Sequence, residues 1–364
     1  MDIKNIKLNC RFFRGDIPCK PNKLYGVHCV DDKGNDCKYF EATKEKILII
    51  KLGAVGDVIR TTPLIFYLMK NFPAAKIYWL THSPIVLPEK VDVVLKYDIE
   101  SITFLQSVKF DYVFNLDKDK EACALLDKID SKIKKGYILK DGVPHPADDD
   151  AVQKYFTGIF DDISLNNTKS YPEEIFEICG FKYSGEKYIL SNFNQFKEDW
   201  DIDKSKLVIG LNTGCGGRWT SRLWADENWV LLAKELIKKK YEVIFLGGEQ
   251  EDDKNTYFAK ASGGKYLGHF RLEKFINLVD QCSLVVTGVT MAMHITIGLN
   301  KKIVLFNNIF NRHEFELFGL GEIIEPEREC KCFYSPTCIN TEYKCMDYIS
   351  VDKVLNTINK LLRK

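Results

Sequence analysis

The sequence predicts an α/β protein made of two doubly wound domains. Residues 46–52 (KILIIKL) and 207–211 (LVIGL) are short, apolar and rich in branched side chains. Such runs are typical of strands buried on both faces, as in a parallel sheet covered by helices on each side. Each run opens an alternation of strand-like and helix-like segments. The length of 364 residues also favours two domains, because single domains usually hold about 100–200 residues.

The first half divides into an extension and a domain. Residues 1–45 hold four cysteines and turn-forming pieces but little periodicity, so they are predicted to be a loop-rich extension. Residues 46–200 form the first predicted domain, with a surface excursion after residue 140 and a linker near 190–205. Its apolar, strand-like runs are 46–52, 76–80, 93–95 and 112–116. One helix-like stretch follows at 172–179.

The second domain is predicted over residues 201–348, and a last helix over 349–364. Ser350 caps that helix, whose apolar residues fall on one stripe, so it is expected to pack back on the fold. The other predicted helices are 227–240 and 272–281, and the predicted strands are 207–211, 243–246, 284–287 and 303–306.

Composition and charge exclude several classes of protein. Hydrophobic residues make up 45% and charged residues 28%, as in ordinary globular proteins, and the net charge of +1 gives no reason to expect a nucleic-acid partner. No apolar run reaches about 18 residues and the N-terminus lacks the apolar core of a signal peptide. We therefore expect a cytoplasmic protein without a transmembrane segment, and leave peripheral contact with a membrane open.

The first loop that could take part in binding or catalysis is residues 53–57 (GAVGD), directly after the first strand. Open α/β sheets place ligands at this edge, and glycines let a backbone approach them closely. The GxxG spacing differs from the GxGxxG of dinucleotide sites, and no acidic residue follows the next strand. Asp57 either caps the following helix or acts as a general base.

Two further loops follow strands of the second domain. Residues 212–222 (NTGCGGRWTSR) offer hydroxyls, amides and two arginines that suit phosphate, although a solvated loop is the alternative. Cys215 in this loop is better explained as a small packed thiol than as a nucleophile. Residues 287–294 (TGVTMAMH) open a helix whose N-terminus favours an anion. Both loops lie at one sheet edge and could hold one diphosphate, while Glu249 could accept bonds from a ribose diol.

The segment KILIIKLGAVGDVIRTTP resembles the opening of the ADP-heptose:lipopolysaccharide heptosyltransferases, glycosyltransferase family 9. The segments RWTSRLW, FLGGEQED, LVDQCSLVVTG and MAMH agree with that family in order and spacing, so the resemblance covers about residues 46–364. It implies a GT-B fold, in which two Rossmann-like domains face a cleft and the C-terminal helix commonly crosses back to the first domain.

The resemblance also implies an activity: metal-independent, inverting transfer of a sugar such as heptose from an ADP-linked donor. The acceptor would be a glycan such as the lipopolysaccharide core, another lipid-linked glycan or a protein. Asp57 would be the general base, and Arg60 could meet an anionic acceptor or simply be a solvated helix arginine. The residues expected at the donor are Thr213, Gly214, Arg218, Arg222, Glu249, Thr290, Met291 and His294.

One departure from the family pattern concerns the donor sugar. The usual Asp-Ser/Thr-Gly-Pro-Met-His turn is replaced by residues 289–294 (VTMAMH), so Val289 stands where an acidic residue is expected near the sugar hydroxyls. Altered sugar specificity and weakened activity are both open. Two alternatives to sugar transfer therefore remain: another GT-B nucleotide-sugar enzyme such as an epimerase, and a catalytically impaired, metal-bearing binding protein.

Eight of the twelve cysteines cluster near the ends of the chain. In a reducing compartment they are candidate ligands for a structural zinc or iron rather than disulfides. The alternatives are unliganded thiols and one site shared between both ends, and some autotransporter-modifying relatives carry a four-cysteine iron site. The two sets are Cys10, Cys19, Cys29 and Cys37, with eight, nine and seven residues between them, and Cys330, Cys332, Cys338 and Cys345.

Overall fold

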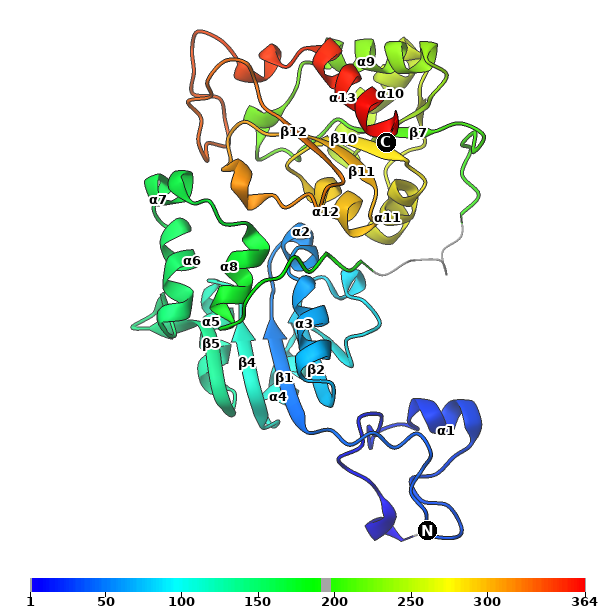
Figure 1. The fold of residues 1–364 in the computed structure, drawn as a ribbon, viewed down its shortest axis with the longest axis vertical. Helices are drawn as coiled ribbons and strands as arrows, with labels where there is room; N and C mark the ends of the chain where they lie inside the picture. The colour runs from blue at the N-terminus through cyan, green and yellow to red at the C-terminus, as the bar shows by residue number, and fades with distance from the viewer. Residues whose placement is uncertain (1, 191–197, 364) are drawn as a thin grey trace. The chain divides into compact units, whose positions relative to one another are not determined.

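The computed structural model describes residues 2–190 and 198–363 and divides the chain into two compact units (Figure 1). The first unit consists of Met1–Gly53, Pro63–Val152 and Ile178–Phe181, and the second of Ala54–Thr62, Gln153–Glu177 and Lys182–Lys364. Three segments of the predicted first domain thus belong to the second unit: 54–62, 153–177 and the stretch from residue 182 to the predicted boundary at 200. The predicted linker at 190–205 falls largely on residues 191–197, which lie outside the described residues.

The first unit is built on one six-stranded sheet in the order β3-β2-β1-β4-β5-β6. Ile47 of β1 pairs in parallel with Ile77 of β2 and Tyr112 of β4, and helices pack on the sheet around a core that includes Leu48, Ile50 and Leu126. Its elements are β1 Glu45–Ile50, α3 Pro63–Asn71, β2 Ala75–Thr81, β3 Val93–Lys96, α4 Ile99–Gln106, β4 Phe110–Asn115, α5 Lys120–Lys128, β5 Ser131–Lys140 and β6 Val143–Pro146.

The surface excursion predicted after residue 140 is instead a β-hairpin. Strands β5 and β6 are antiparallel, and Lys140 pairs with Val143 across a two-residue turn. Asp141 and Gly142 in that turn have φ of 51° and 78°. Positive φ at both positions matches the right-handed twist of the strands, and Asp-Gly is a preferred sequence for it. The prolines at 144 and 146 are tolerated because β6 is an edge strand.

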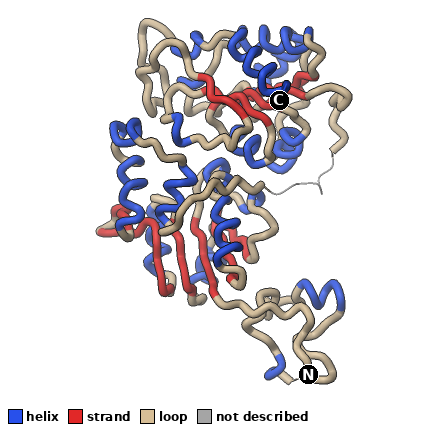
Figure 2. The backbone as a smooth tube through the Cα atoms, in the orientation of Figure 1, coloured by secondary structure: helices blue, strands red, loops and turns tan. Residues whose placement is uncertain are grey.

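The second unit holds a parallel six-stranded sheet in the order β12-β11-β10-β7-β8-β9. Its strands are drawn in red among blue helices in Figure 2. Read from β9, this is the same strand order as in the first sheet, so the prediction of two Rossmann-like domains is confirmed. The order reverses between β7 and β10, where ligands bind in such sheets. The elements are β7 Val208–Asn212, α9 Asp226–Lys238, β8 Glu242–Leu246, α10 Asp252–Ser262, β9 Lys265–Tyr266, α11 Leu272–Asp280, β10 Leu284–Gly288, α12 Met291–Gly298, β11 Lys302–Phe306 and β12 Gly321–Ile324.

Four short helices from the first half of the chain also pack within or beside the second unit. Helix α2 packs against α12. A buried Asn311 side chain donates to the carbonyl oxygens of Ser164 and Asn167, both at 2.6 Å, and holds the end of α7. The four helices are α2 Val55–Ile59, α6 Val152–Thr157, α7 Asp161–Asn166 and α8 Tyr171–Ile178.

The C-terminal helix, α13 Val351–Arg363, packs on the second sheet, beside α9 and strands β11 and β12 (Figure 1). Its apolar stripe, which includes Val354 and Ile358, joins the core of this unit. The indole of Trp224 donates to the Ile349 carbonyl oxygen at 2.9 Å and fixes the approach to the helix.

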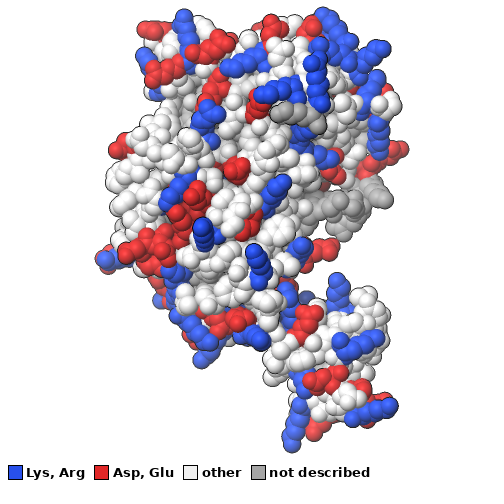
Figure 3. Space-filling view, viewed as in Figure 1, with Lys and Arg blue, Asp and Glu red and all other residues white. Residues whose placement is uncertain are grey.

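The N-terminal extension has little regular structure besides α1 Lys20–Tyr25. Arg11 ties it to the first unit through a two-bond ion pair with Asp92, at 2.5 and 3.0 Å. On the face shown in Figure 3, acidic and basic side chains are intermixed, in keeping with the small net charge. Within the described residues, no helix is long and apolar enough to cross a membrane.

Candidate active site

A cavity of about 610 Å³ opens at the carboxyl ends of β7, β8 and β10 in the second unit. Its size lies in the usual range for small-molecule sites, and its place is where the strand order reverses. Three loops contribute its polar wall, at residues 212–216, 247–251 and 290–292, and Arg222 and Val55 also line it. An apolar wall comes from Phe270, Leu272 and Phe275.

The loop after β7 presents its backbone to this cavity. The side-chain amide of Asn212 donates to the Thr287 hydroxyl at 3.0 Å and to the Gly214 carbonyl at 3.2 Å, so the loop is tied to β10. A Cβ at Gly214 would lie 2.1 Å from Glu251, and only glycine fits there. Thr213 does not line the cavity, because its buried hydroxyl donates to Asn255 at 2.6 Å.

The loop after β8 uses its acidic residues in two ways. The predicted Glu249 lines the cavity and is exposed. Glu251, which the sequence did not single out, is buried and accepts a hydrogen bond from the Gly248 amide at 2.9 Å. This bond fixes the conformation of the loop after β8. Glu249 is therefore the carboxylate of this loop that remains available to a ligand.

The two predicted arginines occupy different places. Arg222 lines the cavity with its guanidinium 5.6 Å from the Trp219 ring and 5.3 Å from the Phe310 ring, and it donates to the carbonyl oxygen of Val289. Burial lowers the pKa of Arg222 from its ordinary value. Arg218 lies over the Trp219 ring at 5.3 Å and is not among the lining residues.

The turn before α12 places the start of a helix at the cavity. Thr290, Met291 and Ala292 line it, and the Thr290 hydroxyl lies 3.2 Å from that of Thr287. The first amides of a helix have no partner within the helix and carry partial positive charge. Together with Arg222, this turn makes the wall suited to an anion.

His294 lies deeper in α12 and is not among the residues that line the cavity. It is buried against α2, where a Cβ at Gly56 would approach its Cδ2 atom to 2.4 Å. Burial, and next the charge of Arg60, lower the pKa of His294 to about 3, so the ring is neutral at pH 7. In this structure His294 packs against Gly56 of α2.

Asp57 is held on α2 by an ion pair. Ala54 occupies the N-cap position, so Asp57 is not the N-cap; its carboxylate meets the Arg60 guanidinium at 2.7 Å. The Asp57 side chain is 33% exposed, whereas that of Arg60 is 16% exposed. Asp57 is thus oriented by a fixed cation while part of it stays open to a ligand.

Arg60 is neither a solvated helix arginine nor a free contact for an acceptor. Its Cζ atom lies 3.4 Å from the centroid of the Tyr171 ring, and a second carboxylate, Glu314, is 4.0 Å away. Burial alone would lower the pKa of Arg60, but the nearby charges of Asp57, Tyr171 and Glu314 raise it above the ordinary value. No sequence signal pointed to Tyr171 or Glu314, because their pairing with Arg60 joins distant segments.

The C-terminal cysteine loop, residues 330–345, reaches both sides of this site. The Tyr334 hydroxyl donates to Glu314 at 2.9 Å, next to Arg60. The Ser221 hydroxyl donates to the Ser335 carbonyl at 2.7 Å, and Ser221 is the neighbour of Arg222. The loop therefore braces the surroundings of Asp57 and of the anion wall.

The two cysteine sets form two separate clusters. In the second unit, the sulfurs of Cys332 and Cys338 are 3.8 Å apart, and Asn308 donates to the sulfurs of Cys330 and Cys345 at 3.8 and 3.4 Å. The four N-terminal thiols line one separate small cavity in the first unit. Within residues 2–190 and 198–363, no three Cys, His, Asp or Glu side chains already stand where they could hold a metal ion.

Comparisons with known proteins agree with this architecture. The fold is similar to a glycosyltransferase family 9 protein from Veillonella parvula, with a TM-score of 0.66, 18% identity, and coverage of 89% of this chain and 99% of that one. The ADP-heptose heptosyltransferase II of E. coli gives a TM-score of 0.62 and 16% identity, covering 87% and 98%. The iron-containing dodecameric glycosyltransferase TibC of enterotoxigenic E. coli gives 0.56 and 11%, covering 88% and 77%.

The sequence itself carries the family signal. No curated protein matches the chain. The model of glycosyltransferase family 9 (heptosyltransferase), however, matches residues 105–312, which is more than half of the 364 residues. The fold, with its two Rossmann-like sheets, is the GT-B fold of these structures. The chain therefore belongs to glycosyltransferase family 9 and is a glycosyltransferase.

Proposed function

We propose that the protein transfers a heptose or a similar sugar from an ADP-linked donor to a hydroxyl of a glycan or protein acceptor, with inversion. One observation carries this proposal. Val55, at the start of α2, lines the cavity of the second unit, and the partly exposed Asp57 follows two residues later on the same helix. Asp57 does not itself line that cavity, but its carboxylate is held by Arg60 and partly exposed on the same helix, as a general base for sugar transfer requires.

The donor diphosphate fits the wall formed by Arg222 and the start of α12. Negative charge develops on the diphosphate as the bond to the sugar breaks, and fixed positive charge stabilises that change. The nucleoside fits the opposite part of the cavity, where Phe270 and Phe275 offer an apolar face and Glu249 an acceptor for a ribose hydroxyl.

Asp57 acts on the acceptor in this proposal. The acceptor oxygen attacks the anomeric carbon, its proton passes to the Asp57 carboxylate, and the bond between sugar and diphosphate breaks. Arg60 orients that carboxylate through their ion pair. No step requires a metal ion.

Val289 bears on the choice of sugar. An acidic residue in its place, as in the family pattern, could bind sugar hydroxyls through its side chain, whereas Val289 provides a carbonyl oxygen that is occupied by Arg222. We propose that this change alters how the hydroxyl groups of the donor sugar are recognised.

A donor screen followed by a transfer assay tests the function. Thermal shift with ADP-, GDP- and UDP-linked sugars should show stabilisation by ADP-sugars above the others, since ligand binding to the native state raises stability. Sugar should then move to an acceptor glycan. Binding of no nucleotide sugar, or conversion of a UDP-sugar without an acceptor, would overturn the proposal, and the latter result would favour an epimerase.

We also propose that the C-terminal cysteines bind a structural zinc or iron ion. The 3.8 Å between the sulfurs of Cys332 and Cys338 equals the edge of a tetrahedron with metal–sulfur bonds of about 2.3 Å, which is about 3.8 Å. The amide of Ile339 donates to the Cys332 sulfur at 3.3 Å, as suits a thiolate. A metal there would hold the loop that braces Ser221 and Glu314.

A further inference from the structure

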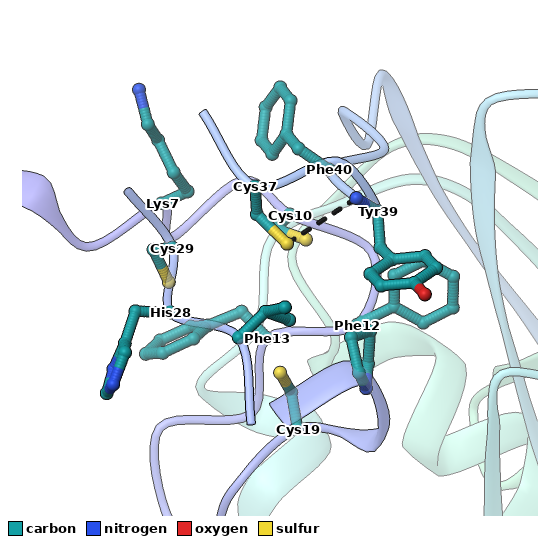
Figure 4. A pocket seen from close by; sticks show the side chains of 12 residues that line it. Lys7, Cys10, Phe12, Phe13, Cys19, His28, Cys29, Cys37, Tyr39 and Phe40 are labelled. Atoms are coloured by element: carbon teal, nitrogen blue, oxygen red, sulfur yellow. Dashed lines mark hydrogen bonds between the residues drawn. The ribbon is translucent and has the colours of Figure 1, made fainter. Parts of the chain in front are cut away.

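The four thiols of the N-terminal extension line one small cavity. Figure 4 shows Cys10, Cys19, Cys29 and Cys37 around it, with the rings of Phe13 and Tyr39 among them. The cavity has a volume of about 20 Å³. A space just above the size of one water molecule excludes an organic ligand but admits a single ion.

The cysteines reach this cavity from separate stretches of chain. Cys10 forms an isolated β-bridge with Ala42, near the end of the extension. Cys29 and Cys37 flank a tight turn, in which the Cys37 amide donates to the Cys29 carbonyl oxygen at 2.9 Å. Cys19 lies directly before α1. Such convergence of four distant thiols is unexpected unless they share one role.

The extension lacks the usual means of holding a fold together. Among the described residues 2–44, Pro21 is the one residue that is buried. The four cysteines are free, so the segment has no disulfide. A segment of this size without an apolar core needs a covalent or metal cross-link to fix its loops.

Polar groups surround the cavity. The Tyr39 amide donates to the Cys37 sulfur at 3.4 Å, the kind of bond that orients a metal ligand. Lys7 lines the cavity, and Lys76 of β2 reaches the Phe13 carbonyl oxygen at 3.5 Å. Four thiolates around a divalent cation carry a net charge of −2; Lys76 is a nearby ammonium group, while Lys7 is already paired with Asp36 at 2.7 Å.

We propose that Cys10, Cys19, Cys29 and Cys37 form a structural metal site for one zinc or ferrous ion, which folds residues 2–44 as a module on the first unit. Binding requires the thiol side chains to turn toward a common point, because no three of these described thiols surround one already. His28 also lines the cavity but is not needed to complete a set of four thiolates. This proposal goes beyond sugar transfer and does not rest on it.

Metal counting on the full-length protein tests the site. We expect elemental analysis to show that a quadruple variant, with serine in place of all four N-terminal cysteines, binds one ion fewer per chain than the unchanged protein. A second quadruple variant, altered at Cys330, Cys332, Cys338 and Cys345, should retain the N-terminal ion. The element found distinguishes zinc from iron.

Two matched variants show which groups bind the ion. Cys215→Ser changes a half-buried thiol outside both sets and should leave the metal content unchanged. His28→Ala should also retain the ion, since imidazole is not a ligand. Loss of the ion in His28→Ala would overturn the four-thiolate assignment.

Further measurements do not depend on how well the quadruple variant folds. Cobalt(II) added to the metal-free, unchanged protein should give the intense absorption of tetrahedral thiolate coordination. A chelator should make residues 2–44 sensitive to protease while the rest of the chain stays resistant. A metal content that is the same with and without the N-terminal cysteines, or a mass showing two disulfides among them, would overturn the proposal.

Discussion

Asp57 and Arg60 lie one helical turn apart, and their ion pair decides how the proposed base behaves. The pair is anchored on the arginine side, where Tyr171 and Glu314 surround the guanidinium. Asp57 is the more exposed partner, so it can accept a proton from a bound hydroxyl without leaving its position.

Removing the charge of Asp57 separates catalysis from binding. Asp57→Asn keeps the shape of the side chain, so the donor affinity should stay within about twofold, while kcat falls by about a hundred- to ten-thousand-fold. Calorimetry with the nucleotide and a transfer assay measure the two effects. Asp161→Asn, an exposed carboxylate in α7, is the matched control and should leave both constants unchanged. A variant with full kcat would show that Asp57 is not the base.

Protonation of His294 is expected to make the free energy of unfolding depend on pH. Its pKa is lowered to about 3 in the folded protein, first by burial, whereas it is about 6.5 in the unfolded chain. The unfolded state therefore binds more protons between these values, and the free energy of unfolding falls by up to about 1.4 kcal/mol per pH unit as the pH drops below about 6.5.

Urea unfolding at several pH values checks this prediction. His294→Asn should lose stability less steeply between pH 6.5 and 4 than the unchanged protein, because it removes one titrating group. His313→Asn, at an exposed position, should keep the original slope. Equal slopes for His294→Asn and the unchanged protein would contradict the lowered pKa of His294.

At the scale of elements, α2 and α12 meet without space for a side chain at Gly56. A Cβ there would lie 2.4 Å from His294, so Gly56→Ala must push the helices apart. Overpacking of this kind costs about 1–3 kcal/mol of unfolding free energy. Thermal unfolding should show the loss, whereas Gly288→Ala should not, since an added Cβ at Gly288 meets nothing within 4 Å. If Gly56→Ala unfolded with the same free energy as the unchanged protein, α2 and α12 would have accommodated the added Cβ without cost.

The cysteine loop couples to the site through single hydrogen bonds. Tyr334→Phe removes the bond to Glu314 and should lower kcat about two- to tenfold, the effect of one net hydrogen bond, with donor affinity unchanged. The same change at Tyr343, whose hydroxyl donates to the Glu329 carbonyl in the same loop, should leave kcat as it was. Steady-state kinetics with both variants distinguishes bracing of Arg60 from a general loosening of the loop.

At the scale of the whole molecule, periodic apolar runs were enough to predict both Rossmann-like sheets. The hairpin at Asp141 and Gly142 was missed although its Asp-Gly signal is local, because prolines nearby suggested an excursion. The cavity loops were predicted from strand ends, but the aromatic wall of Phe270 and Phe275 was not, since it comes from beyond those ends. Contacts such as Arg60 with Glu314 depend on packing between remote segments, which no local pattern reports.

The membership of α2 in the second unit has a consequence for recombining relatives of this enzyme. A chimaera joined at residue 200 would combine one parent's cavity with another parent's α2, which carries the proposed base. Gly56 would then face a foreign residue 294. An exchange of the second unit must therefore move residues 54–62 and 153–177 together with residues 182–364, as a single inherited block.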